Sequence, residues 1–143
     1  MDTTIAIASD HAGVELKTLL AGYLRELGYA AEDLGTHEKA SVDYADYANT
    51  LAAWIRGDTE RKGILVCGSG IGVSIAANRH AHIRAALCQD GLMAELARRH
   101  NNANVLCLGA RLIGVEVARE CVRRFLAAEF EGGRHASRVE KLG

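Results

Sequence analysis

The sequence carries no large excess of charge of either sign. Its 17 Lys and Arg residues are matched by 18 Asp and Glu residues, which leaves a formal net charge of −1. A chain balanced in this way has no broad positive field that would attract nucleic acid or an anionic membrane surface. We therefore expect neither nucleic acid nor a membrane as a partner, and any anionic ligand must be bound by a local group of cations.

Long apolar runs and closely spaced cysteine pairs are also missing. No run approaches the length of about 20 residues that crosses a bilayer. Residues 1–4 read MDTT, without the basic stretch and apolar run of a secretion signal. The four cysteines include no C-x-x-C pair, which is typical of free thiols in a reducing compartment. We therefore expect a cytoplasmic protein.

The chain does contain a regular alternation of apolar runs of strand length with segments of helical period. Its 143 residues are 49% hydrophobic and 24% charged, which is typical of one globular domain, residues 1–143. The pattern predicts five strands, at residues 4–8, 30–34, 63–67, 84–88 and 104–108. Helices are expected at about 16–27, 46–55 and 90–100, with a short one ending near residue 78.

A further helix should begin after Gly114 and bury Val117, Ala118, Cys121, Val122 and Phe125. Strands that alternate with helices predict an α/β fold, a Rossmann-like three-layer α/β/α sandwich around a five-stranded parallel sheet. In such sheets the ligand lies outside the carboxyl ends of the strands. The residues that follow the strands are therefore the candidates for a site.

The strongest local signal follows the predicted strand 63–67. Residues 67–74 read CGSGIGVS, and the glycines let backbone N–H groups approach an anion or a developing oxyanion at the start of a helix. The positive end of that helix should favour the thiolate of Cys67. The spacing fits neither a Walker A loop nor a dinucleotide fingerprint, and Val73 stands where a cysteine phosphatase would have arginine. An inert buried cysteine in a tight turn is the alternative.

Imidazole and charged side chains occur together at three other places. Asp10 and His11 follow the first strand, where the carboxylate either caps a helix or moves protons. His100 continues the face of Leu92 and Leu96, so it is either a packed histidine or a general acid. Arg134 and Arg138 would share one face of a C-terminal helix, either as a phosphate site or as a solvated basic face. His80 and His82 lack a neighbouring carboxylate or cysteine, so we expect no metal site there.

Taken in order, these segments resemble the type B ribose-5-phosphate isomerases and the related galactose-6-phosphate isomerase subunits. The matching stretches are SDHAG at 9–13, SVDY at 41–44, CGSGIG at 67–72, IAAN at 75–78, HN at 100–101 and GGRH at 132–135. The resemblance implies an aldose–ketose isomerase of a small-molecule sugar phosphate that uses no metal and no cofactor. It also implies a homodimer with sites shared between the subunits, and it leaves open a dimer of dimers.

The resemblance further implies a role for each site residue. Cys67 would be the base that takes the C2 proton, and Asp10 would move hydroxyl protons. His100 would be the acid that opens the sugar ring, and it would reach in with Asn101 from the partner subunit. The enediolate oxygen would be held by the glycine loop, consisting of Gly68, Ser69, Gly70, Ile71 and Gly72. Tyr44 would line the sugar pocket, and the phosphate would be bound by His11, Arg134, Arg138 and the partner's Arg111.

Two positions depart from the pattern of this family. Some members have a glutamate base where this chain has Val73, so the chain matches the members with a cysteine base. Members often have proline where this chain has Ala45, which should loosen the loop that carries Tyr44. The alternatives to a ribose 5-phosphate isomerase are an isomerase of allose or galactose 6-phosphate and a non-catalytic sugar-phosphate sensor, which would need only the phosphate-binding residues.

Overall fold

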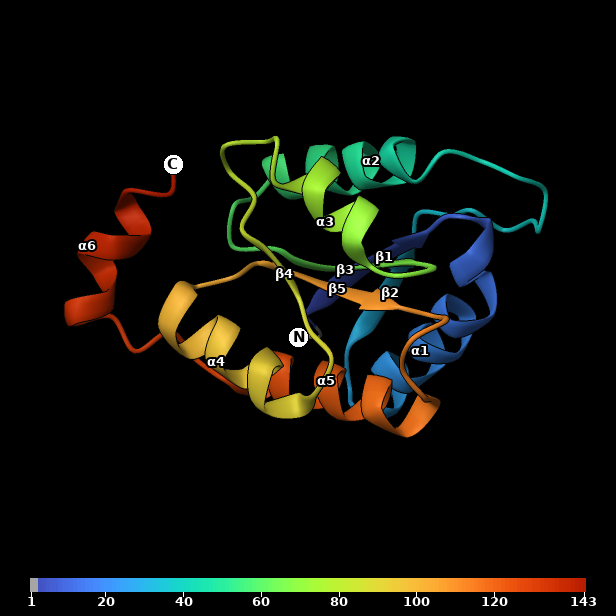
Figure 1. Cartoon of the computed structure of the whole chain (residues 1–143). Coiled ribbons are helices and arrows are strands. Elements are labelled where there is room, and N and C mark those ends of the chain that lie inside the picture. Colours follow the sequence, from blue (N-terminus) through green and yellow to red (C-terminus); the bar gives the residue numbers. More distant parts are fainter. Residues whose placement is uncertain (1–2) are drawn as a thin grey trace.

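The sheet of this protein contains five parallel strands, in the computed structural model that describes residues 3–143. The strand order is β2-β1-β3-β5-β4, and every neighbouring pair is parallel. The strands are β1 (Thr4–Ser9), β2 (Ala30–Asp33), β3 (Lys62–Cys67), β4 (Ala85–Leu87) and β5 (Val105–Gly109). Helices cover both faces of the sheet (Figure 1), which confirms the predicted α/β/α sandwich.

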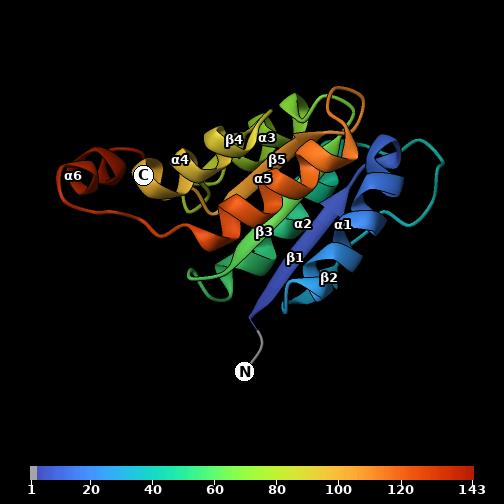
Figure 2. The ribbon, with the colours of Figure 1, turned by 90° about the horizontal axis from the view of Figure 1, so that it is seen from below.

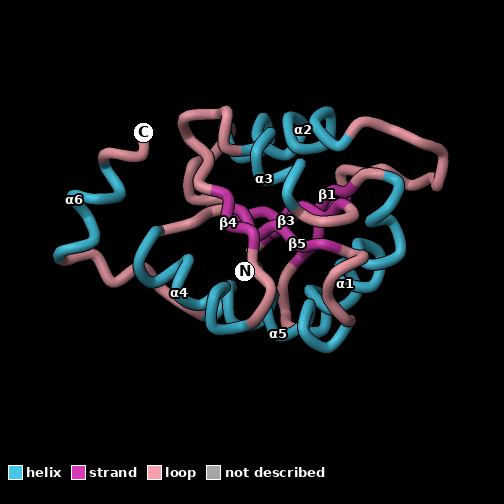
Figure 3. Tube along the Cα trace, in the orientation of Figure 1, coloured by secondary structure: helices cyan, strands magenta, loops and turns pink. Residues whose placement is uncertain are grey.

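The helices form two layers. On one face α2 (Tyr44–Arg56) packs against α3 (Ile71–Ala77), and the other face is covered by α1 (Val14–Glu26), α4 (Gly91–Asn101) and α5 (Val115–Ala127). The short α6 (Arg134–Glu140) packs beside α4 and lies outside the two layers (Figure 2). The connection between β2 and α2 projects at the opposite end of the molecule from α6 (Figure 3). None of the helices in residues 3–143 is both long enough and apolar enough to span a membrane.

Alternating side chains of the strands form two separate cores. One strand face packs against α1, α4 and α5 through Ile5, Ile7, Ile64, Val66, Leu106 and Leu108. The other packs against α2 and α3 through Ala6, Ala8, Leu65, Cys67, Val105 and Cys107. Because the central strands are covered on both sides, their sequences are apolar without interruption. The thiol of Cys67 therefore belongs to the layer of α2 and α3.

Local sequence determines where α4 begins and ends. Asp90 precedes the helix, and its Oδ1 accepts a hydrogen bond of 2.8 Å from Met93 N, as a helix cap does. Asn102 follows the helix in the left-handed conformation, with φ of 48°. Asn tolerates this conformation better than most residues and commonly ends helices.

Four details differ from the prediction, and one is that Leu92 on α4 is 53% exposed, so the expected face of Leu92, Leu96 and His100 is not the packed one. Val117 is 38% exposed instead of buried, because the face of α5 that packs inward carries Ala118, Cys121, Val122 and Phe125. The fourth strand covers Ala85–Leu87 only and is shorter than 84–88. Tyr44 is the first residue of α2 and not part of a loop, so Ala45 lies within a helical turn.

Candidate active site

Two segments far apart in the sequence meet at the carboxyl edge of the sheet. β1 and β3 are neighbours with Ser9 aligned with Val66, and Asp10 N donates a hydrogen bond of 3.2 Å to Val66 O. From β1 the chain continues to β2 on one side, and β3 lies on the other side. This is the topological switch point at which open α/β sheets bind their ligands. Asp10 and Cys67 therefore lie at the place where the fold predicts a site.

Cys67 ends β3 with only 4% of its surface exposed. Its Sγ accepts a hydrogen bond from Gly70 N at 3.2 Å, so the chain folds back over the sulfur before α3 begins. Gly70 has φ of 79°, and a Cβ on it would lie 2.6 Å from Leu87 Cδ1. Only glycine fits this turn, because it combines a left-handed backbone with a packed surrounding. The predicted glycine turn is thus present.

The other three cysteines are poor candidates for a base. Burial raises the pKa of Cys88 to about 12 and that of Cys121 to about 11. Burial also raises the pKa of Cys107, which lies fully enclosed on the neighbouring strand. A thiol with a raised pKa stays protonated at neutral pH, and the thiolate is the reactive form.

Residues from two other segments surround the Cys67 turn, and Ser69 belongs to the turn itself. The ring of Tyr44 lies against Gly72, since a Cβ at Gly72 would be 2.6 Å from Tyr44 Cε1. Arg111 N donates to Gly68 O at 2.9 Å, and its Nη1 would be 3.2 Å from a Cβ at Gly68. Ser69 Oγ accepts a hydrogen bond of 3.1 Å from Ile71 N. Each of these neighbours was expected to contact the sugar phosphate.

Asp10 and His11 each have a structural contact. Asp10 is 6% exposed, and its Oδ1 accepts a hydrogen bond of 3.0 Å from Ala12 N, so the predicted helix cap is present, on the short 3-10 helix at 11–13. His11 Nδ1 accepts a hydrogen bond of 3.1 Å from Val42 N. This contact holds the projecting connection between β2 and α2 against the site.

The remaining expected residues form a second group at the opposite edge of the sheet. α4 connects β4 to β5, so it starts at the carboxyl edge and ends at the amino edge with His100 and Asn101. A helix of 11 residues is about 16 Å long at 1.5 Å per residue. Arg134 and Arg138 lie on α6, which packs against α4.

The structure therefore groups the expected phosphate residues differently from the prediction. Within one chain Arg111 lies with the Cys67 turn, whereas Arg134 and Arg138 lie with His100. A cavity of about 440 Å³ extends from the amino end of β4 to Leu142 and includes Asn101, but no residue of the Cys67 turn lines it.

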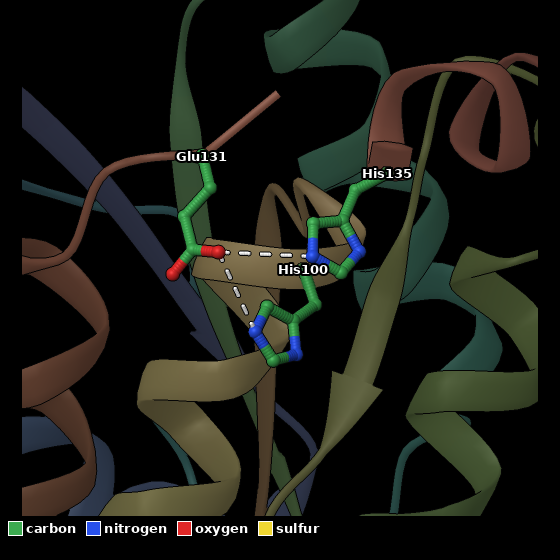
Figure 4. Close-up of side chains that lie close together, drawn as sticks. All are labelled: His100, Glu131 and His135. Carbon is green, nitrogen blue, oxygen red and sulfur yellow. Dashed lines mark ion pairs between the residues drawn. The ribbon is translucent and has the colours of Figure 1, made fainter. Parts of the chain in front are cut away.

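Two residues near His100, Glu131 and His135, were not among the site residues expected from the sequence. Figure 4 shows Glu131 facing the imidazoles of His100 and His135, with Oε1 3.7 Å from the Nε2 atom of each. The two rings are stacked, with centroids 4.4 Å apart and planes at 12°. Glu131 lies before α6 and is separated from His135 by Gly132 and Gly133 in positive-φ conformations, so no helical spacing in the sequence signalled this contact.

The two neighbours of His100, Glu131 and His135, differ in charge at neutral pH, although the pKa of each is lowered. A hydrogen bond from Arg99 keeps the pKa of Glu131 low, so this carboxylate is ionised at neutral pH. Burial lowers the pKa of His135, and the nearby His100 and Arg134 lower it further. His135 is therefore neutral at neutral pH.

Among the described residues, His100, Glu131 and His135 are also the group whose donor atoms all lie within 4.8 Å, as a metal site requires. Stacked imidazoles direct their in-plane lone pairs side by side and not toward one point. In addition, Arg99 Nε already holds Glu131 Oε2 at 2.6 Å. The arrangement suits two imidazoles that share one carboxylate better than it suits a cation.

Comparison with known proteins gives a consistent result over nearly the whole chain. A family model described as Ribose/Galactose Isomerase matches residues 5–142. Ribose-5-phosphate isomerase B of Escherichia coli (strain K12) is 44% identical over 138 residues, which cover 96% of this chain and 93% of that protein. D-erythrulose-4-phosphate isomerase of Pectobacterium atrosepticum is 45% identical over 141 residues, which cover 98% of this chain and 93% of that protein.

Solved structures share both the fold and the sequence. A ribose 5-phosphate isomerase from Thermotoga maritima has a TM-score of 0.95 and 51% identity, covering 99% of this chain and 98% of that one. Ribose-5-phosphate isomerase B from Mycoplasma genitalium, with bound ribulose-5-phosphate, has a TM-score of 0.95 and 41% identity, covering 99% and 95%.

Proposed function

Because the chain belongs to the ribose/galactose isomerase family, we propose that it interconverts ribose 5-phosphate and ribulose 5-phosphate through an enediolate. The observation that carries this proposal is the Cys67 turn at the switch point of the sheet. It places a sulfur, backbone N–H groups and the Asp10 carboxylate at one edge of two adjacent strands. Isomerisation needs a base beside C2 and donors where negative charge develops.

In the proposed reaction the Cys67 thiolate removes the proton from C2 of the open-chain aldose. The electron pair of that C–H bond forms the C1–C2 double bond, and negative charge develops on the carbonyl oxygen at C1. That charge is stabilised by the hydroxyl of Ser69 and by the N–H groups of the glycine loop other than those of Gly70 and Ile71, which bond to Cys67 Sγ and Ser69 Oγ. Asp10 moves a proton between the two hydroxyl oxygens, and return of the proton from Cys67 to C1 gives the ketose.

The phosphate keeps its bonds in this reaction and anchors the substrate. Arg111 and His11 lie on the Cys67 side, and Arg134 and Arg138 lie at the other edge of the same chain. A clamp made of all four therefore needs two subunits. Binding energy from the phosphate would hold C1 and C2 against the base.

We infer a homodimer in which each Cys67 turn faces the α4–α6 end of the partner subunit. Large apolar side chains are exposed along α3 and at the start of α4, at Ile71, Ile75, Leu92 and Met93, with 44–55% of their surface accessible. Burying them against a second copy would remove an apolar surface from water. His100 would then reach the sugar ring of the partner's site as the ring-opening acid.

We further propose a cytoplasmic location, because Cys67, Cys88, Cys107 and Cys121 are all free and buried. Reduced thiols persist in a reducing compartment.

The base is tested with Cys67→Ala, with Cys107→Ala as the matched control. Cys107 lies on the neighbouring strand and in the same core layer. Loss of the base should lower turnover of ribose 5-phosphate by about 10²–10⁴-fold, while the control should keep turnover within a few-fold. Near wild-type turnover of Cys67→Ala, in a coupled assay on folded protein, would rule out this base.

The substrate is tested in the same assay with ribose 5-phosphate and the 6-phosphates of allose and galactose. A four-carbon ketose phosphate should be included, because one relative is an isomerase named for D-erythrulose 4-phosphate. Activity should survive a chelator if no metal takes part. Binding of ribose 5-phosphate without exchange of its C2 hydrogen into solvent would indicate a sensor instead.

A further inference from the structure

A small polar cavity lies at the amino edge of the sheet, away from the Cys67 turn. It has a volume of about 70 Å³, and its lining consists of Thr59, Glu60, Arg61, Lys62, Arg84, Arg98, Asn102 and Asn104. Lys62 begins β3, and Arg84 and Asn104 directly precede β4 and β5. Four of the lining residues carry positive charge and one carries negative charge, so the cavity is strongly basic.

The arginine side chains around this cavity are held in place by the turn after α4. Arg84 Nε donates a hydrogen bond of 2.7 Å to Asn102 O. Arg98 is 8% exposed, and its Nη1 donates to Asn102 Oδ1 at 2.9 Å and to Ala103 O at 2.7 Å. Both guanidinium groups are therefore preorganised, and a ligand would lose little affinity to ordering them.

In the described part of the chain, Glu60 is the one acidic side chain in the lining of this cavity, and it forms no close ion pair with the cations there. Within residues 3–143 neither Lys62, Arg84 nor Arg98 takes part in an ion pair shorter than 4.0 Å, with Glu60 or with any other acid. The buried Nε of Arg98 has no hydrogen-bond partner in the same part of the chain. Buried polar atoms without partners are rare, and a missing ion is one of their ordinary explanations.

The mutual effects of these groups agree with a shared, desolvated space. Burial lowers the pKa of Lys62, and the positive charge of Arg98 lowers it further, while the negative charge of Glu60 opposes both effects. Burial lowers the pKa of Arg98, Arg84 adds to this lowering, and Glu60 opposes it. Like charges that are close enough to disfavour one another would be relieved by one anion bound between them.

We propose that this cavity binds one phosphate group, held by Lys62, Arg84 and Arg98. The volume is sufficient for a single tetrahedral oxyanion, since one water molecule needs only about 10–15 Å³ of such space. Arg84 and Arg98 supply forked donors that match oxyanion oxygens, and Lys62 supplies a point charge. The lining has almost no apolar part, so it offers no pocket for a sugar or a base, and the ligand is inorganic phosphate or the terminal group of a monoester.

This site is separate from the proposed catalytic site. It shares no residue with the Cys67 turn or with the phosphate clamp of α6. The cavity is linked to the catalytic residues through α4, because Arg98 and Asn102 flank His100 and Asn101, and through β3, which begins at Lys62 and ends at Cys67. Anion binding would therefore stabilise the end of α4 without taking part in the chemistry.

The test uses nuclear magnetic resonance of arginine Nε–H groups in the full-length protein. Inorganic phosphate is titrated at constant ionic strength, with sodium chloride as the balancing salt. We expect the Nε–H signals of Arg84 and Arg98 to shift with one saturable curve. The variant Lys62→Gln should weaken that binding at least tenfold, whereas Lys39→Gln, which removes an exposed charge elsewhere, should leave it unchanged. Methyl phosphate in a second titration separates the two sources: an equal affinity favours a monoester and a weaker one favours the free ion.

The proposal is wrong if neither arginine signal responds to phosphate, or if Lys62→Gln and wild type give the same curve. The isomerase proposal is tested independently, because Lys62→Gln should keep turnover within about twofold. The double variant Arg134→Ala/Arg138→Ala should lose turnover and still show the phosphate shift at Arg84 and Arg98. A loss of that shift in the double variant would place the ligand in the clamp and would contradict the second site.

Discussion

At the scale of single residues, Lys17 is the most unusual side chain of the interior. Only 1% of it is exposed, and its Nζ lies 2.6 Å from Asp33 Oδ2 at the end of β2. Partial burial opposes ionisation of Asp33, but hydrogen bonds from Lys17 and from Gly35 N prevail and keep its pKa below the ordinary value. The ion pair joins α1 to the end of β2, next to the β2–α2 connection that His11 contacts.

Replacing Asp33 should lower the free energy of unfolding more than replacing Lys17. Asp33→Asn leaves a buried ammonium without its partner and should cost roughly 2–4 kcal/mol, since the carboxylate is partly solvated. Lys17→Met keeps the volume, removes the buried charge, and should cost less than about 1 kcal/mol. Urea unfolding of both variants at neutral pH measures the difference. Equal losses would mean that the charge of Lys17 is not desolvated.

The pH dependence of the same pair has a definite sign. The lowered pKa of Asp33 means that its contribution to stability is present above about pH 4 and is lost as the pH falls through the folded-state value. The stability gap between wild type and Asp33→Asn should therefore narrow in acid. Unfolding curves at about pH 3 and at neutral pH check this. A constant gap would contradict the assigned ionisation of Asp33.

At the scale of elements, the turn between β3 and α3 depends on Gly70. A side chain there would need a φ of 79° and would lie 2.6 Å from Leu87 Cδ1 and 2.9 Å from the carbonyl carbon of Leu108. Both the backbone and the packing therefore require glycine. This turn positions the sulfur of Cys67, and it also positions Gly72, which the ring of Tyr44 contacts.

We expect Gly70→Ala to destabilise the protein by roughly 2–4 kcal/mol, from the positive φ and from overpacking together. The matched control is Gly22→Ala in the middle of α1, where an added Cβ meets nothing within 4 Å. That control should stabilise the protein by about 0.4–1 kcal/mol. Thermal unfolding of both variants measures the two changes in stability. A neutral Gly70→Ala would show that the turn is less constrained than its contacts indicate.

At the scale of the whole molecule, one chain keeps the expected catalytic residues in two groups. The end of α4 is separated from the Cys67 turn by the length of a helix and belongs to the other edge of the sheet. In a symmetric dimer, the Cys67 turn of one subunit could meet the end of α4 of the partner, because twofold symmetry brings different parts of two identical subunits together.

Shared sites predict complementation between two inactive variants. Cys67→Ala and His100→Asn should each be nearly inactive, and mixing them under conditions of subunit exchange should restore roughly a quarter of wild-type turnover, since half of the dimers then hold one intact site. Mixing Cys67→Ala with Asp10→Asn, whose changes lie on the same side, should restore nothing. Absence of rescue in the first mixture would contradict a site shared across subunits.

Helix α4 shows where prediction from the sequence was limited. Its limits and its period were predicted, because the caps Asp90 and Asn102 and the apolar spacing are local. The packed face was not, since Leu92 is 53% exposed and the buried residues are Ala94, Ala97 and Arg98. His100 therefore lies on a partly exposed face, with Glu131 and His135 as neighbours that no helical spacing on α4 could indicate.

The sequence by itself determined the α/β alternation, the glycine turn after β3 and four of the five residues expected to be buried on α5, because these depend on neighbours within one or two turns of the chain. Only the tertiary structure decided that β1 lies beside β3, so that Asp10 meets Cys67, and that Arg111 lies apart from Arg134 and Arg138. It alone also brought Lys62, Arg84 and Arg98 around one cavity. The physical reason is that strand order and helix docking are contacts between distant segments, which no local pattern encodes.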